Sequence, residues 1–423
     1  MFFQDKLPNG LSAIMLMAGV FGGAAVLSVF LGIHIKEVMS AYQYNVLVIL
    51  VAMDLFTKLI VKTGIMQLLA TKIAIASNGN LRHIAFLFGL LMFLVSAFLN
   101  NITAVMIILP IVFVMLKSLY VDRRYVNVFF AIILALCNTG GASSPIGDFP
   151  AIVIMTSGIT TFPDYLLRAM PLFFATSLIL LAVWIPQIRK QKEMTTSKFA
   201  VHLLYSRYKH VKVDYSTLLP LLIILVLMFF AWSFVPQNVL PPETIAVLGY
   251  IAAAFVCSAR GMKINQELDF KSVLTISAFL FMAGVISKTG WLTDMANVLQ
   301  ENITDPKILL IAIMLITSIV SGVFSAGPAA AAMMPVIAGL CNTTLSAQTH
   351  WVAIAYAASI CAGSSLFMWS ATAGFILSDK IEKAKLTESG QSIPWGIVNY
   401  FRYGIVNYCA QMAIAIAAMI IIL

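Results

Sequence analysis

One stretch of this chain, residues 96–104, places serine, asparagine and threonine side chains inside a long apolar run that continues through Pro110. A related stretch, residues 321–335, follows in the second half. The hydrocarbon core of a membrane offers no water, so backbone groups released by an interrupted helix must bond to protein, to a cavity or to a bound ion. Polar residues at that depth are costly and usually functional. Two such interruptions therefore indicate a transport site.

The composition identifies the class of protein. Of 423 residues, 61% are hydrophobic and 10% are charged, whereas soluble domains are about 45–50% apolar and about 25% charged. A membrane span needs about 20 mostly apolar residues, and the apolar runs suffice for about ten to twelve full spans and several shorter pieces. The sequence predicts an all-α polytopic membrane protein. Its first residues lack the pattern of a cleaved signal peptide, so we expect residues 11–33 to remain as the first span.

The basic residues that give a net charge of +9 lie in loops between apolar runs. Residues 189–214 alone hold seven Lys or Arg against two acids, and such loops face the cytoplasm by the positive-inside rule. We therefore expect a multi-pass protein of the cell inner membrane that contacts the lipid bilayer and binds no nucleic acid. Five scattered cysteines without a CxxC pair predict neither a disulfide framework nor a metal site, and no cofactor is expected.

Three matches between the two halves, in the same order and at similar spacing, predict an internal repeat. A Lys-Thr-Gly triplet at 62–64 returns at 288–290, Pro110 returns as Pro335, and the segment 141–144 resembles the segment 362–365. Chance matches among Ala, Gly and Ser are the alternative. Duplicated halves, usually inverted, are typical of secondary transporters. The predicted organisation is an N-terminal span (1–43), repeat 1 (44–188), a basic cytoplasmic loop (189–214), connecting spans (215–270) and repeat 2 (271–423).

The polar residues of the first half form two groups of candidate ligand-binding residues, and a purely structural role is the alternative. Asn and Thr are good caps for a helix start, where free N–H groups and the helix dipole favour an anion. Residues 138–148 combine glycines, which allow close backbone approach, with hydroxyls suited to a hard cation such as sodium. An ordinary loop, with Asp148 only capping the next half-helix, is the alternative. The candidate binding residues are Asn100, Asn101, Thr103, Asn138, Thr139, Gly140, Gly141, Ser143, Ser144 and Asp148.

The second half offers hydroxyls and small residues but neither an amide nor a carboxylate in its matching segments. The two half-sites are therefore chemically unequal. Close helix packing by small residues is the alternative function for this set. Separately, Asp54 and Lys58 lie four residues apart on one helix face, which favours a structural ion pair over a proton relay. The second-half candidates are Ser325, Gly327, Gly363, Ser364, Ser365, Ser370 and Thr372.

With these motifs the chain resembles the ion transporter superfamily, which includes citrate-type and dicarboxylate/sodium symporters, arsenite permeases and sodium/proton antiporters. Residues 96–110 look like its first signature, and residues 138–148 are similar to the Asn-x-Gly-Gly-x-x-Ser-Pro-Ile-Gly-Asp segment of the antiporter branch. The resemblance implies broken helices with re-entrant hairpins and a homodimer, each protomer with a scaffold domain and a moving transport domain. Residues 11–60 and 216–290 would then supply most of the scaffold.

The resemblance also implies roles for single residues. Asn101 takes the place of the asparagine in the Ser-Asn-Thr motif that binds sodium and substrate carboxylate in the dicarboxylate branch, so sodium is expected at Asn101, Ser143 and Ser144. In the antiporter branch the two breaks carry aspartates, and here Asn100 and Ser325 replace them. An amide or a hydroxyl does not change charge with pH as a carboxylate does. Proton exchange through that pair of positions is therefore excluded.

The function predicted first is a secondary active transporter that moves a small anionic solute, an organic acid or an inorganic oxyanion, by alternating access with sodium or proton coupling. A sodium/proton antiporter is the second candidate, supported by residues 138–148. A passive channel would need polar residues lining whole helices. No Ser-His-acid set, HExxH or phosphate loop occurs in the sequence, so an enzyme is not expected.

Overall fold

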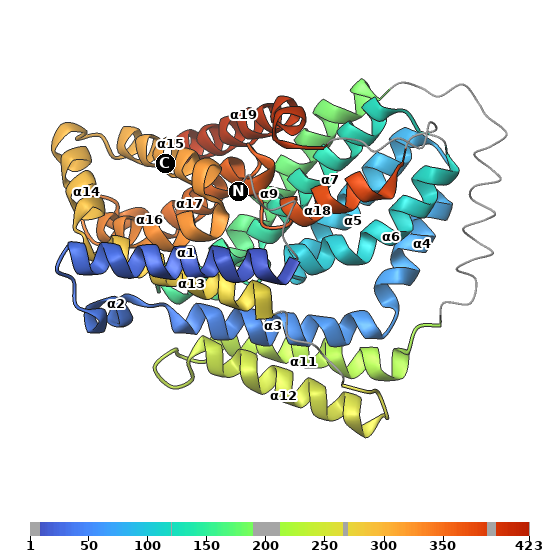
Figure 1. Ribbon diagram of the computed structural model, residues 1–423, viewed down its shortest axis with the longest axis horizontal. Helices are drawn as coiled ribbons and strands as arrows, with labels where there is room; N and C mark the ends of the chain where they lie inside the picture. The colour runs from blue at the N-terminus through green and yellow to red at the C-terminus, as the bar shows by residue number, and fades with distance from the viewer. Residues whose placement is uncertain (1–8, 120, 189–211, 265–269, 387–394, 423) are drawn as a thin grey trace.

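The computed structural model of the chain describes residues 9–119, 121–188, 212–264, 270–386 and 395–422 (Figure 1). Every regular element in these ranges is a helix. In chain order they are α1 (Asn9–Phe30), α2 (Ile35–Ala41), α3 (Tyr44–Lys62), α4 (Ile65–Ala76), α5 (Leu81–Phe98), α6 (Asn101–Ser118), α7 (Arg123–Ser143), α8 (Phe149–Thr156), α9 (Phe162–Trp184), η2 (Ile185–Gln187), α11 (Tyr215–Phe234), α12 (Pro242–Ala259), α13 (Phe270–Lys288), α14 (Trp291–Asn302), α15 (Pro306–Phe324), α16 (Ala326–Cys341), η3 (Ser346–Gln348), α17 (Thr349–Ser364), η4 (Met368–Ser370), α18 (Gly374–Ala384) and α19 (Ile397–Ile422).

Within the described ranges, 8 helices are long and apolar enough to cross a membrane, or 9 if the pair α16 and α17, bent by 111°, forms one broken span. The chain is thus an all-helical, multi-pass membrane protein with broken helices, and this part of the predicted fold class is confirmed. The expected ten to twelve spans stay a prediction, since α1 and α13 are only partly described. Most of the predicted basic loop, residues 189–211, also lies outside the described residues.

The Lys-Thr-Gly triplet makes the same backbone turn in both halves. Gly64 separates α3 from α4 with a φ of 84°, and Gly290 separates α13 from α14 with a φ of 81°. This left-handed conformation is open to glycine and strained for residues with a Cβ. The repeated glycine therefore marks a repeated bend between a long helix and a short one.

Equivalent side chains also join the next helices of each half. The Ser96 hydroxyl on α5 donates to the Cys137 carbonyl on α7 at 2.8 Å, and the Ser321 hydroxyl on α15 donates to the Ile360 carbonyl on α17 at 2.9 Å. In both cases a serine near the end of one helix satisfies a carbonyl of the helix packed against it. The two halves thus share a contact as well as an order of elements.

Two glycines allow the helices of these pairs, α5 with α7 and α15 with α17, to approach each other closely. A Cβ at Gly140 would collide with the Phe93 carbonyl on α5, and a Cβ at Gly363 would collide with the Ser318 carbonyl on α15. Gly140 therefore corresponds to Gly363, whereas the match of segment 141–144 with segment 362–365 had placed Ala142 opposite Gly363. That alignment was wrong by two positions, because it matched the serine pairs, whose distance in sequence from the close-approach glycine differs between the halves.

A tyrosine from the last helix of each half supports the corrected register. The Tyr165 hydroxyl on α9 donates to the Ala142 carbonyl at 2.8 Å, and the Tyr400 hydroxyl on α19 donates to the Ser365 carbonyl at 3.0 Å. Each acceptor lies two positions after the close-approach glycine of its own half. The limits of the predicted repeats, 44–188 and 271–423, stay a prediction.

One short helix of each half packs against the other half. Helix α8 of the first half packs against α16 and α17 of the second, and α18 of the second half packs against α6 of the first. Figure 1 shows α18 reaching across to the side of α5, α6 and α7. The hairpins at the ends of α7 and α17 are thereby brought between the halves.

The helices expected to form a scaffold pack against one another. Helix α3 packs on α12, α12 on α11, and α13 on both α1 and α2, and Figure 1 shows α3, α11 and α12 along the lower side of the molecule. Helices α3 and α13 also contact α8 and α16, which belong to the interrupted region. The division into scaffold and transport domains stays a prediction.

Candidate functional site

The first interruption lies between α5 and α6. Helix α5 ends at Phe98, Leu99 and Asn100 are extended, and α6 begins at Asn101. The Asn100 side-chain oxygen accepts the Ile102 N–H at 2.9 Å, which is the usual bond of an N-cap. The Asn100 side chain thus caps the start of α6, as expected from its residue type.

A buried amide and a buried carboxylate meet directly behind this break. The Asn101 Nδ2 donates to Asp148 Oδ2 at 2.8 Å, and the Ser96 hydroxyl, which also contacts the Cys137 carbonyl, lies against Asn101 Oδ1. Asn101 is 0% exposed and Asp148 is 6% exposed. The other carboxylate oxygen of Asp148 accepts the Phe149 N–H at 2.9 Å and so caps α8. Asp148 therefore caps α8, as its alternative role predicted, and also accepts from Asn101, while its role in ion binding stays a prediction.

Gly141 makes room for this pair. A Cβ at Gly141 would lie 2.7 Å from Asn101 Oδ1 and 2.8 Å from the Asp148 Cβ. Neither distance is tolerated by real Cβ atoms. Gly147 is similarly close, since its Cβ would lie 2.5 Å from the Gly141 carbonyl oxygen. The two glycines allow the hairpin of residues 138–148 to fold tightly around the carboxylate.

The second half adds a hydroxyl to the same carboxylate. Thr372 Oγ1 lies 3.3 Å from Asp148 Oδ2 and 3.5 Å from Asp148 Oδ1. Thr372 follows η4, so its hairpin meets the first hairpin at this point. A buried carboxylate is tolerated when its oxygens accept hydrogen bonds, and here the bonds come from both halves of the chain.

A second contact between the halves is centred on Ser365. Its hydroxyl accepts from Asn138 Nδ2 at 3.1 Å and from Gln411 Nε2 at 3.0 Å, and it donates to the Cys361 carbonyl at 3.0 Å. Gln411, on α19, was missed in the sequence analysis. The available indication was that the apolar run 404–423 holds two amides, Asn407 and Gln411, since polar groups at membrane depth need partners.

The second interruption is a single residue. Ser325 ends α15 and starts α16 with a φ of 92° and a ψ of 153°. Its hydroxyl donates to the Ser370 carbonyl at 3.1 Å, and the Ser370 hydroxyl contacts the carbonyls of Gly363 at 3.3 Å and Ser364 at 3.1 Å. Gly327 packs beside the ring of Phe149. Ser325 and Ser370 thus lie together at the second break.

Other candidates bond mainly to neighbouring helices or to their own turn. The Thr139 hydroxyl pairs with Ser177 of α9 at 2.7 Å, away from Asp148's partners. The Ser143 and Ser364 hydroxyls donate to carbonyls three residues earlier in their helices, at 2.6 and 2.9 Å, and Ser144 donates to the carbonyl at the end of α5. A donating hydroxyl keeps lone pairs, so sodium at Asn101, Ser143 and Ser144 stays a prediction.

An acid–base pair lies next to the first break. Asp54 and Lys58 on α3 form the expected ion pair, with 2.6 Å between Nζ and Oδ2. The Thr103 hydroxyl on α6 donates to Asp54 Oδ1 at 3.1 Å, a contact the sequence did not indicate. Asp54 and Lys58 are 24% and 28% exposed, so the pair is half-buried. A hydrogen bond therefore links α6 to α3 close to where α6 begins.

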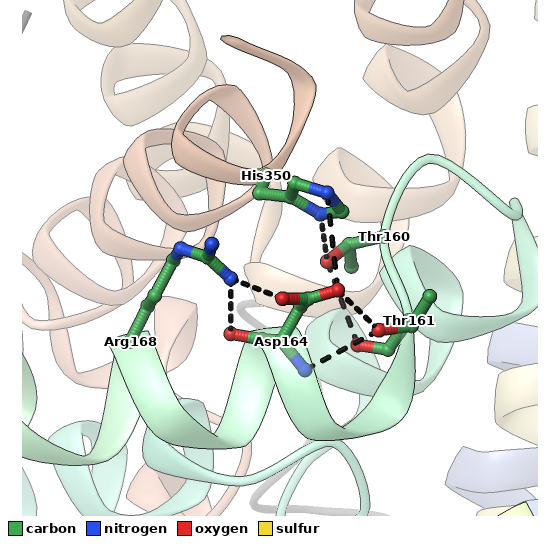
Figure 2. A network of polar contacts seen from close by, with 5 residues as sticks. All are labelled: Thr160, Thr161, Asp164, Arg168 and His350. Carbon is green, nitrogen blue, oxygen red and sulfur yellow. Dashed lines mark hydrogen bonds and ion pairs between the residues drawn. The ribbon is translucent and has the colours of Figure 1, made fainter. Parts of the chain in front are cut away.

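A further polar network joins the halves where α9 and α17 begin (Figure 2). Arg168 pairs with Asp164 at 2.5 Å, and the second oxygen of Asp164 lies 3.8 Å from His350 Nε2. The His350 Nδ1 is 3.0 Å from the Thr160 hydroxyl. Thr161 caps α9 and also donates to Asp164 at 2.5 Å. This network connects the halves near helix ends, outside the group around Asp148.

Comparison with known protein families identifies the class of the protein. Residues 5–361 match the model of the family described as "Citrate transporter". The chain belongs to the citrate transporter family. It is therefore a membrane transporter rather than an enzyme, and the family is one of those named in the resemblance drawn from the sequence.

Several relatives are similar to this member of the citrate transporter family along most of its length. An uncharacterized transporter of Mycobacterium bovis is 25% identical over 342 residues, which cover 79% of this chain and 77% of the relative. The magnetosome protein MamN of Magnetospirillum gryphiswaldense is 27% identical over 371 residues, covering 84% and 81%. The YdaH transporter of Alcanivorax borkumensis shares the fold, with a TM-score of 0.55, 12% identity and 97% of each chain covered.

Proposed function

We propose that this protein is a secondary active transporter that moves a small anionic solute, an organic acid or an inorganic oxyanion, across the inner membrane by alternating access. One observation carries the proposal. The Asp148 carboxylate is held by Asn101 of one half and by Thr372 of the other, at the place where two interrupted regions meet. A site made by both halves changes its shape when the halves move relative to each other, as alternating access requires.

The starts of α6 and α16 support an anionic solute. Both helices begin at an interruption, and the N-cap of α16, Ser325, forms no side-chain capping bond. The N–H groups of a helix start and the positive end of its dipole favour an anion.

We propose that coupling uses Asp148 and the oxygens around it. Asp148 is the buried acid of the hairpins, and sodium bound with Asn101, Ser143 and Ser144 would place a cation beside it. Sodium ions prefer oxygen ligands of this kind. The same acid also supports sodium/proton antiport as the second candidate. We further propose that the transporter works as a homodimer.

Uptake into proteoliposomes tests the proposal. Purified protein is reconstituted, a panel of labelled carboxylates and oxyanions is supplied, and sodium and proton gradients are imposed separately. Saturable uptake of an anion that needs one of the gradients is the expected result. Sodium-dependent proton movement without any added anion would favour antiport, and weakly saturating flux without a gradient would favour a channel and overturn the proposal.

A further inference from the structure

A cavity of about 740 Å³ opens at the opposite end of α7 from the hairpin. It is formed where α7 begins, where α9 ends and where α19 begins. The chain enters the basic segment 189–214 directly after α9, so this end of the molecule is the one expected to face the cytoplasm. None of the residues that bind Asp148 lines this cavity.

Three arginines give the cavity its charge. Arg123 and Arg124 come from the first turn of α7, and Arg402 comes from α19. No ion pair formed by the residues that the structure describes involves any of the three. Guanidinium groups bind phosphate through paired N–H donors. Three of them facing one cavity without a carboxylate partner create a site for a strongly anionic group.

A buried amide oxygen lies beside the arginines. Asn127, one turn into α7, is 8% exposed and lines the cavity. Its Oδ1 accepts no hydrogen bond from the part of the chain that the structure describes. A buried acceptor without a donor is unfavourable by about 1–3 kcal/mol, so a ligand hydroxyl here would satisfy a group that the protein leaves open. The cavity thus offers donors for an anion and an acceptor for a hydroxyl.

Two aromatic rings form another part of the lining. Trp184, at the end of α9, and Tyr403, on α19, have ring centroids 5.7 Å apart. Trp184 is held in place because its indole N–H donates to Asn407 Oδ1 at 2.7 Å. Aromatic rings of this type are common at the level of lipid headgroups. They offer a flat apolar surface next to the charged part of the cavity.

We infer that this cavity binds a phosphate group that carries a neighbouring hydroxyl, as in glycerol phosphate. The phosphate lies among Arg123, Arg124 and Arg402, and the hydroxyl donates to Asn127 Oδ1. Basic pockets between membrane helices on the cytoplasmic side bind anionic lipid headgroups. The same chemistry is present in a phosphatidylglycerol headgroup and in a soluble glycerol phosphate, and the experiment distinguishes the two sources.

Binding to the purified full-length protein tests the inference. Native mass spectrometry and thermal shift are measured with phosphatidylglycerol, with phosphatidylmethanol, which has the phosphate but no hydroxyl, with phosphatidylcholine, and with soluble glycerol 3-phosphate. Phosphatidylglycerol or glycerol 3-phosphate is expected to bind and stabilise, and competition between them shows which source is preferred. Equal binding of phosphatidylcholine and phosphatidylglycerol would overturn the inference. Absence of binding by both phosphatidylglycerol and glycerol 3-phosphate would also overturn it.

Variants separate the site from general attraction of anions. Arg402→Gln and Arg124→Gln are each expected to weaken binding by about ten-fold, the effect of one lost charge-assisted hydrogen bond. Lys117→Gln removes an exposed positive charge that does not line the cavity and is expected to leave binding unchanged. Asn127→Leu is expected to abolish the preference for phosphatidylglycerol over phosphatidylmethanol. Equal effects of the arginine and lysine variants would show unspecific charge attraction instead.

Discussion

Thr372 donates a hydrogen bond to Asp148 at 3.3 Å, although the two residues come from different halves of the sequence. Asp148 is the N-cap of α8, and Thr372 lies two positions before the first residue of α18. The contact therefore joins the starts of the short helices of the two halves, with a carboxylate on one side and a hydroxyl on the other.

Replacing Thr372 tests this contact between the halves. Thr372→Val removes the donor to a buried carboxylate and should lower the free energy of unfolding by about 1–3 kcal/mol, together with the uptake rate. Thr372→Ser keeps the hydroxyl and serves as the control. Thermal unfolding and proteoliposome uptake measure both effects. Equal behaviour of the two variants would show that the hydroxyl is irrelevant.

Removing the amide of Asn101 should impair transport more than it impairs folding. Asn101→Ala deletes the bonds to Ser96 and Asp148, and uptake is expected to fall by at least about ten-fold, the effect of losing one strong bond at the site. Size-exclusion profiles should stay those of the native protein. Asn302→Ala, on the exposed end of α14, is the control. Normal uptake by Asn101→Ala would remove this residue from the site.

Two glycine variants separate steric effects from helix propensity. Gly141→Ala places a Cβ 2.7 Å from Asn101 Oδ1, so the hairpin must shift and uptake should be lost. Gly339→Ala lies within α16, where nothing comes within 4 Å of the added Cβ. It should be neutral or stabilising by up to about 1 kcal/mol, because alanine favours a helix. Uptake and thermal unfolding of both variants check the contrast, which fails if Gly141→Ala transports normally.

The link between α6 and α3 provides a further prediction. Thr103→Val removes the hydroxyl that donates to Asp54 at 3.1 Å, while leaving the Asp54–Lys58 ion pair in place. We expect slower uptake with a loss of stability of about 1 kcal/mol, since one partly exposed hydrogen bond is lost. Thr103→Ser should restore uptake. If Thr103→Val and the unaltered protein have the same uptake rate, this contact has no part in transport.

Features that depend on local sequence could be predicted. The Lys-Thr-Gly triplets were visible as a repeated element, and in both halves the glycine follows the end of a long helix. The breaks at Asn100 and Ser325 were visible because polar residues interrupt apolar runs, and the position of Asn100 predicted its capping bond. The helical, polytopic architecture followed from composition. These properties are encoded within a few neighbouring residues.

Features that depend on how distant segments pack could not be predicted. The contact of Asp148 with Thr372 and that of Ser365 with Gln411 both form only when the halves come together. The predicted register of the repeat was also wrong by two positions, since runs of Ala, Gly and Ser align equally well in several registers. The close approach at Gly140 and Gly363 and the contacts of Tyr165 and Tyr400 distinguish these registers.

The contact between Thr372 and Asp148 has a consequence for how coupling can change in this fold. Thr372 Oγ1 lies 3.5 and 3.3 Å from the two carboxylate oxygens of Asp148, so an acid introduced at position 372 would place a second carboxylate beside the first. Two carboxylates that share a site do not ionise independently, because each disfavours the charge of the other. One substitution at this contact would therefore turn a site with a single acid into a pair that shares a proton, with the surrounding helices unchanged.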